Sequence, residues 1–143
     1  MNAATTDDAA LRALLLASRT IAIVGLSDDT IRPSHGVAAY LQQAGYRIVP
    51  VNPRLAGAPV LGEPSFARLE DIPFAIDIVD VFRRDADVPP VATSAVAIGA
   101  RCLWQQQGIA SAEGDQIARA GGLVSVMDLC LKIEHARLGI ARR

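Results

Sequence analysis

The stretch Thr20-Ile-Ala-Ile-Val-Gly-Leu-Ser27 decides the fold of this chain. Its apolar run from Ile21 to Val24 is continuous, which is typical of a parallel strand buried on both faces. Gly25 ends the run, and Pro33 then stands where its fixed backbone suits the first turn of a helix. The sequence therefore predicts a strand, a turn and a helix start in succession. The N-terminus of such a helix presents backbone N–H groups and a partial positive charge, which suit a phosphate.

Segments with strand and helix patterns alternate along the rest of the chain. Four more strands are predicted over residues 46–51, 76–82, 101–104 and 123–126. Other helices are predicted to begin at Asp7 or Asp8, at Asp85 or Asp87, at Ser111 and at Asp128. Residues 52–74 are rich in proline and glycine and are predicted to be irregular, with a short edge strand at Val60-Leu61 and one helical turn from Phe66 to Leu69. This alternation predicts an α/β fold: a Rossmann-like, doubly wound, mainly parallel five-stranded sheet with helices on both faces.

Composition narrows the class of protein. The length of 143 residues fits one domain spanning residues 1–143. A net charge of −1, with no basic block apart from Arg142-Arg143, gives nucleic acid little to bind. No apolar run reaches the roughly 20 residues of a membrane helix, and Met1 to Asp8 lack the basic region of a signal peptide. We therefore expect a cytoplasmic protein with neither a nucleic-acid nor a membrane partner. Cys102 and Cys130 form no CxxC pair, so no metal site is predicted.

A ligand of such a sheet binds outside the carboxyl ends of the strands, where the strand order reverses. The tips predicted to meet there are Gly25–Ser27, Asn52–Arg54, Phe82–Arg83 and Trp104–Gly108. Gly25 would let the backbone approach a ligand with no side chain in the way. The hydroxyls of Ser27 and Ser34 and the guanidinium of Arg32 would add donors for a phosphate. The same residues also fit a plain tight turn with a capping serine and a solvated arginine.

The first two tips bear on which nucleotide binds. A dinucleotide fingerprint has three glycines, whereas here Ser27 stands in the place of the second. The NAD fold also expects an acid about 20 residues further on, for the ribose hydroxyls. The corresponding stretch, Val49-Pro-Val-Asn-Pro-Arg54, has no acid. Arg54 suits a phosphorylated ribose or is an exposed loop arginine. The first interpretation leaves NADP, with its 2′-phosphate, or coenzyme A, with its 3′-phosphate.

The remaining tips allow two interpretations each. Phe82 either lies against an adenine ring or caps the core, and Trp104 is either a core anchor or a ligand contact. Among the glutamines 105–107, at least one amide is a candidate to bind the amides of a pantetheine arm. His35 is the only histidine placed in the crevice, and no catalytic residue is predicted.

The order of these motifs resembles a known family. The pieces are Val24-Gly-Leu-Ser27, Arg32-Pro-Ser-His35, Gly45-Tyr46, Pro50-Val-Asn-Pro53, Gly62, Asp77, Val81-Phe-Arg83, Trp104-x-Gln106-x-Gly108 and Val126-Met-Asp-x-Cys130. In this order they resemble the small stand-alone CoA-binding proteins, which are similar to the N-terminal CoA-binding domain of the succinyl-CoA synthetase alpha subunit. The resemblance covers residues 15–138 and implies a Rossmann-like CoA-binding domain.

The resemblance also implies which residues bind coenzyme A. Those that would line the nucleotide crevice are Gly25, Leu26 and Ser27. Those that would meet the diphosphate at the helix start are Arg32, Pro33 and Ser34. The phosphorylated ribose and adenine would be bordered by Val51, Asn52, Pro53 and Arg54, and the adenine side closed by Phe82 and Arg83. Nearer the pantetheine arm would lie Trp104, Gln106 and Gly108.

The resemblance does not extend to synthetase activity. The synthetase carries its phosphorylated histidine on a second alpha domain and has a nucleotide-binding partner subunit, and neither His35 nor His135 matches that histidine by position. We therefore predict a protein that binds coenzyme A or an acyl-CoA without catalysis of its own. The alternatives are an NADP-dependent oxidoreductase, with His35 as its candidate proton donor, and a regulatory or interaction protein that responds to CoA.

Overall fold

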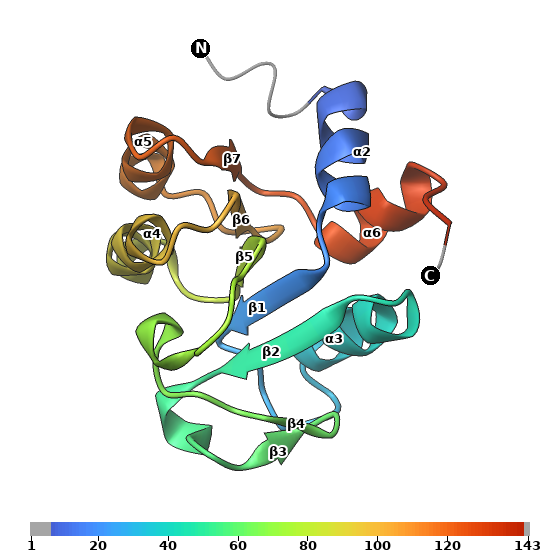
Figure 1. The fold of residues 1–143 in the computed structure, drawn as a ribbon, viewed down its shortest axis with the longest axis vertical. Helices are drawn as coiled ribbons and strands as arrows, with labels where there is room; N and C mark the ends of the chain where they lie inside the picture. Colours follow the sequence, from blue (N-terminus) through green and yellow to red (C-terminus); the bar gives the residue numbers. More distant parts are fainter. Residues whose placement is uncertain (1–6, 142–143) are drawn as a thin grey trace.

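Five parallel strands form the central sheet of the computed structural model, which describes residues 7–141 (Figure 1). The strands are β1 (Thr20–Val24), β2 (Arg47–Val51), β5 (Ile78–Val81), β6 (Cys102–Gln105) and β7 (Val124–Val126). Their order in the sheet is β2-β1-β5-β6-β7, and all neighbours run parallel. The order reverses between β1 and β5, because the chain moves outward to β2 and then returns to the other side of β1. That reversal places the switch point, where ligands bind in doubly wound sheets, between the tips of β1 and β5.

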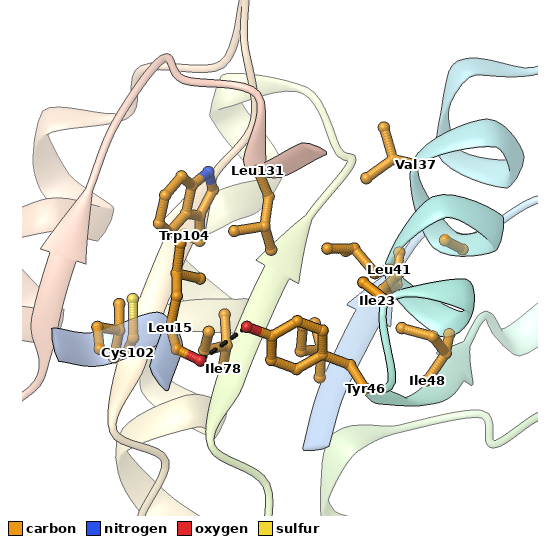
Figure 2. Close-up of a cluster of buried hydrophobic side chains, with 14 of the residues drawn as sticks. Leu15, Ile23, Val37, Leu41, Tyr46, Ile48, Ile78, Cys102, Trp104 and Leu131 are labelled. Carbon is orange, nitrogen blue, oxygen red and sulfur yellow. Dashed lines mark hydrogen bonds between the residues drawn. The ribbon is translucent and has the colours of Figure 1, made fainter. Parts of the chain in front are cut away.

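Helices cover both faces of the sheet, which confirms the predicted fold class. In Figure 1, α4 (Val88–Ala97) and α5 (Ala112–Ala120) lie on the left of the sheet. On its other face lie α2 (Asp8–Ala17), α3 (Pro33–Gln43) and α6 (Leu131–Arg137). Two buried apolar clusters correspond to the two faces. Figure 2 shows the cluster under α2, α3 and α6, in which the hydroxyl of Tyr46 donates a hydrogen bond of 2.7 Å to the carbonyl of Leu15.

Short-range signals fix several helix starts where the sequence predicts them. The Asp7 carboxylate accepts hydrogen bonds from the N–H groups of Ala9 and Ala10 and caps α2. In the same way, the Ser111 hydroxyl accepts a hydrogen bond of 3.0 Å from the N–H of Gly114 and caps α5. Pro33 occupies the first position of α3.

The last helix begins later than predicted. Asp128 was expected to start it, but α6 begins at Leu131 with Cys130 as its N-cap residue. Asp128 instead has a φ of +59°, in the left-handed region, and its carboxylate accepts a hydrogen bond of 2.6 Å from the N–H of Gly108. A helical backbone at Asp128 would lose this contact between two loops that are distant in sequence.

The segment between β2 and β5 is irregular, as predicted, but differs in detail. The expected edge strand at Val60-Leu61 is one arm of a small antiparallel hairpin, β3 (Pro59–Val60) with β4 (Glu63–Pro64). The helical turn expected from Phe66 to Leu69 is a 3₁₀ turn over Leu69–Asp71. Phe66 forms a parallel bridge with Val51 instead, which keeps its backbone extended.

The described part of the chain, residues 7–141, holds no helix long and apolar enough to cross a membrane. The residues before Asp7 and the Arg142-Arg143 pair, both used in the sequence-based expectations, lie outside the described residues.

Candidate functional site

The tips of β1 and β5 meet closely at the switch point. Gly25 has a φ of +90°, and a Cβ added to it would lie 2.3 Å from the carbonyl oxygen of Phe82. The N–H of Phe82 also donates a hydrogen bond of 2.8 Å to the carbonyl of Val24. The close approach of the β5 tip therefore requires glycine at position 25. The predicted approach of a ligand to the Gly25 backbone stays a prediction.

The turn after Gly25 is held by serine hydroxyls. The Ser34 hydroxyl accepts a hydrogen bond of 3.1 Å from the N–H of Ser27. The Ser27 hydroxyl in turn accepts one of 3.0 Å from the N–H of Asp29. At the start of α3, the N-cap residue Arg32 makes no side-chain capping hydrogen bond. Unlike α2 and α5, this helix therefore starts without a side-chain acceptor for its first N–H groups, which suits an anion.

A cavity of about 350 Å³ lies in front of this helix start. We call it the switch-point cavity. It is lined by Gly25, Ser27, Arg32, Pro33, Ser34, Asn52, Arg54, Phe82 and Arg83. Three guanidinium groups thus face one small space in a chain whose overall net charge is −1. Asp29 is the nearest acid to Arg32, at 4.0 Å, and both side chains are mostly exposed, so this pair is weak and leaves Arg32 available.

Asn52 explains why the second strand tip carries an amide rather than the acid of an NAD site. Its side-chain oxygen accepts a hydrogen bond of 3.0 Å from the N–H of Arg54. Its side-chain nitrogen donates one of 3.1 Å to the carbonyl of Leu26. An ionised aspartate could accept the first bond but could not donate the second. Asn52 therefore ties the tip of β2 to the turn after β1 and positions Arg54 at the cavity.

A second, more apolar cavity of about 390 Å³ adjoins the first on the opposite side of the sheet edge. We call it the apolar cavity. Its apolar wall comes from the β1 and β2 tips, the irregular segment and α4: Val24, Val51, Pro53, Leu69, Pro90 and Val91. Arg83 lines both cavities. Leu69, Pro90 and Val91 were not predicted from the sequence to line a site, although the proline pair at the start of α4 is visible there.

A model of the CoA-binding domain matches residues 19–136, most of the chain. This chain belongs to the CoA-binding domain family. The curated protein YneT of Bacillus subtilis (strain 168), itself uncharacterized, is 42% identical over 128 residues, covering 90% of this chain and 93% of YneT. The family assignment confirms the resemblance seen in the sequence.

Solved structures agree with the assignment. The cell-free ID.343 protein of Thermus thermophilus is 39% identical, covers 92% of this chain and 98% of its own, and has a TM-score of 0.89. A hypothetical protein of Pyrococcus horikoshii OT3 is 31% identical, covers 96% of both chains and has a TM-score of 0.90. Both structures share the fold of nearly the whole chain.

The side chains predicted to lie near the pantetheine arm, at the tip of β6, point into the fold. Trp104 is fully buried, and its indole N–H donates a hydrogen bond of 2.8 Å to the carbonyl of Leu129. Of the two interpretations, the structure places Trp104 as a core anchor. Gln106 is only 4% exposed, and its side-chain oxygen accepts a hydrogen bond from the N–H of Leu131. Leu26 is also fully buried.

The glutamines therefore serve the fold first. Gln105 binds Ser111 through both ends of its amide, by donating to the carbonyl and accepting from the N–H. The N–H of Gly108 donates a hydrogen bond to the Asp128 carboxylate. The sequence shows polar groups at a strand tip, but it does not show that residues of neighbouring loops form hydrogen bonds with them.

The titratable groups near the sheet are mostly buried. Burial raises the pKa of the Cys102 thiol, with a smaller contribution from Asp80, so this cysteine is a poor nucleophile. Burial also raises the pKa of Asp80 well above its ordinary value. His135 is buried, with its Nδ1 2.9 Å from the Tyr40 hydroxyl, whereas His35 is in the first turn of α3 and is not among the residues that line the switch-point cavity. Among residues 7–141, no group of three or more candidate ligands is arranged to hold a metal ion.

Proposed function

We propose that this chain binds coenzyme A or an acyl-CoA at the carboxyl edge of its sheet, without catalysing a reaction of its own. One observation carries the proposal: the switch-point cavity combines three arginines with a helix start that has no side-chain cap. An anion with several phosphates would satisfy both features, since charge-assisted hydrogen bonds to guanidinium groups are among the stronger polar contacts. Membership of the CoA-binding domain family supports coenzyme A as that anion.

The two cavities fit different parts of the ligand. The diphosphate would lie at the start of α3, close to Ser27, Arg32 and Ser34. The adenine ring would occupy the apolar cavity, against Pro53 and the first turn of α4. Arg83 lines both cavities, and Arg54 is positioned by Asn52, so these two arginines would bind the 3′-phosphate between them.

Arrangement of the crevice supports binding rather than catalysis. Within the described residues, no histidine lines the switch-point cavity, and the acids of the turn after β1, Asp28 and Asp29, are exposed. His135 is buried against Tyr40 and Tyr46. A nucleophile with a base and an orienting group, the usual basis of acyl transfer, is not assembled at this edge.

Calorimetry with a ligand series tests the proposal. Coenzyme A should bind more tightly than dephospho-CoA by about 1.5–3 kcal/mol, the typical value of a hydrogen bond to a charged group. NADPH should bind more weakly than coenzyme A, because its third phosphate is on the 2′ oxygen and it has no pantetheine arm. Equal affinity for coenzyme A and dephospho-CoA would show that Arg54 and Arg83 do not bind the 3′-phosphate. Tighter binding of NADPH would favour an oxidoreductase instead.

A further inference from the structure

One buried side chain of the sheet is not explained by the fold. Asp80 lies on the central strand β5, paired in register with Ile23 of β1 and Trp104 of β6. It is fully buried, and neither carboxyl oxygen makes a hydrogen bond with any residue of the range 7–141. The sequence shows this acid inside an otherwise apolar strand tip, Ile78-Val-Asp-Val-Phe82. A buried polar group without a partner costs stability, so its presence needs a reason.

A second acid three residues earlier shows how the fold treats a carboxylate that it uses. The Asp77 carboxylate accepts hydrogen bonds from the N–H groups of Arg19 and Thr20 and from the Arg101 side chain. Asp80 has none of these partners, although it lies deeper in the sheet. Burial raises the pKa of Asp80 well above its ordinary value, and the protonated carboxyl group that this favours can both donate and accept a hydrogen bond.

Asp80 lies near the crevice along its strand, two residues before Phe82. Side chains alternate along a strand, so Asp80 shares its face with Ile78 and Phe82. Phe82 lines the switch-point cavity and also a more open hollow of about 540 Å³ on its other side, which Arg84 and Ile109 help to line. Phe82 therefore borders both spaces, and Asp80 is its neighbour two residues earlier on the same face of the strand.

The backbone of Phe82 is held in place, whereas its ring is less constrained. Its N–H is bonded to Val24, and its carbonyl packs against Gly25, so the main chain is fixed at this point. Its ring is only partly buried against the cluster under α3 and α6. Rotation of the ring about its side-chain bonds would therefore leave the strand tip in place.

We propose that Asp80 is a ligand-binding residue, whose carboxyl group hydrogen-bonds an amide or hydroxyl of the pantetheine arm when the Phe82 ring turns aside. This inference rests on the proposed binding of coenzyme A. It gives the unpartnered carboxyl a function: the free protein keeps an unfavourable buried group that the bound arm satisfies. The nucleotide and the arm would then be recognised by separate parts of the edge, the arginines and Asp80.

Two ligands distinguish binding by the arginines from binding by Asp80. Coenzyme A and 3′-phosphoadenosine 5′-diphosphate share the nucleotide and its phosphates, but only the first has the arm. In the wild-type protein both should bind in calorimetry. Asp80→Val should bind the armless nucleotide as the wild type does and coenzyme A about three- to ten-fold more weakly, the effect expected for one lost hydrogen bond. The same variant should melt at a higher temperature without ligand, because an unpartnered polar group is replaced by an apolar one that suits a buried strand.

Two further variants sharpen the test. Asp80→Asn keeps an uncharged side chain of the same size that donates and accepts, so it should retain most of the preference for coenzyme A that valine loses. Ser125→Ala is the matched control, because the Ser125 hydroxyl is also buried without a hydrogen-bond partner among residues 7–141 but lies on the edge strand β7. This control should leave the ratio of the two affinities unchanged.

The outcomes are distinct. An unchanged ratio of affinities in Asp80→Val overturns the role of Asp80, as does an equal loss in Asp80→Asn, which would indicate packing rather than hydrogen bonding. If the valine variant does not fold, Asp80→Ala makes the same comparison. Failure of both ligands to bind the wild-type protein overturns the proposed function itself, a result that cannot be confused with the first two.

Discussion

The amino edge of the sheet and the start of α3 at its carboxyl edge treat their polar groups differently. At the amino edge, the Asp77 carboxylate accepts from the N–H groups of Arg19 and Thr20 at 2.7 and 3.1 Å, and Arg101 pairs with it at 3.2 Å. At the carboxyl edge, α3 begins without a side-chain cap in front of a cavity lined by three arginines. The first edge satisfies its polar groups internally. At the carboxyl edge Ser111 also caps α5, but the start of α3 keeps donors that the proposed ligand would use. We call the first the structural edge and the second, where binding is proposed, the binding edge.

The largest effect should come from breaking the contact that shapes the binding edge. Gly25→Ala would force a Cβ to 2.3 Å from the Phe82 carbonyl oxygen, at a backbone φ of +90°. We expect it to lower the free energy of unfolding by about 2–4 kcal/mol, from steric overlap added to backbone strain. Chemical denaturation measures the change.

Gly57→Ala is the control for that substitution. Gly57 has a similar φ of +84°, but a Cβ there would meet nothing within 4 Å. It should cost only the backbone strain, about 1 kcal/mol. Equal losses for the two variants would show that the approach of β5 to β1 is not what requires Gly25.

The second prediction concerns the arginines of the binding edge. Arg54→Gln should weaken the binding of coenzyme A by about 1.5–3 kcal/mol and the binding of dephospho-CoA much less, because the variant loses the partner of the 3′-phosphate. Arg101→Gln is the matched control, since Arg101 pairs with Asp77 at the amino edge. Calorimetry that finds the same loss for both ligands would place Arg54 on another part of the nucleotide.

The third prediction addresses the structural edge. Asp77→Ala removes the acceptor of two backbone N–H groups and the partner of Arg101. We expect it to lower the unfolding free energy by about 1–2 kcal/mol, the typical effect of leaving donors without a partner at a partly exposed site. The affinity for coenzyme A should stay the same. A changed affinity in titrations of the folded variant would show that the two edges are coupled through β5.

The smallest effect expected is a pH dependence from the buried acid of the binding edge. Burial raises the folded-state pKa of Asp80 above its ordinary value of 3.8, so the folded protein binds a proton that the unfolded chain releases. The stability of the wild-type protein therefore falls as pH rises through this interval, and below pH 3.8 the penalty is absent. Asp80→Asn cannot ionise, so its stability relative to the wild type should increase as pH rises above about 4. Thermal melts at a series of pH values check this; a constant difference would show that Asp80 does not titrate differently in the two states.

Local sequence patterns predicted most of the fold. The apolar runs of the strands, Pro33 at the start of α3 and the capping side chains of Asp7 and Ser111 act within a few residues of themselves. Their physical effects are therefore readable from neighbours in the chain. The same holds for Arg32 and Ser34, which follow the first strand at a spacing that brings them to its tip. The lack of an acid near Asn52 predicts a ligand other than NAD, and this stays a prediction.

Non-local contacts decided the rest. Asp128 has a left-handed backbone that no local pattern indicates, because its partner, the N–H of Gly108, is 20 residues away. Trp104 and Gln106 stand at a strand tip in the sequence, yet the loop that precedes α6 binds both of them and turns them inward. Their directions depend on how that loop crosses the sheet.

The sequence by itself thus determined the type of sheet, the phosphate-sized turn and the family. Only the tertiary structure showed that Gly25 accommodates Phe82, that Asn52 must be an amide and that Asp80 has no partner. The physical reason is the range of the forces involved. Burial patterns and caps are properties of adjacent residues, whereas steric contact and hydrogen bonding across the carboxyl edge arise when strands distant in sequence pack together.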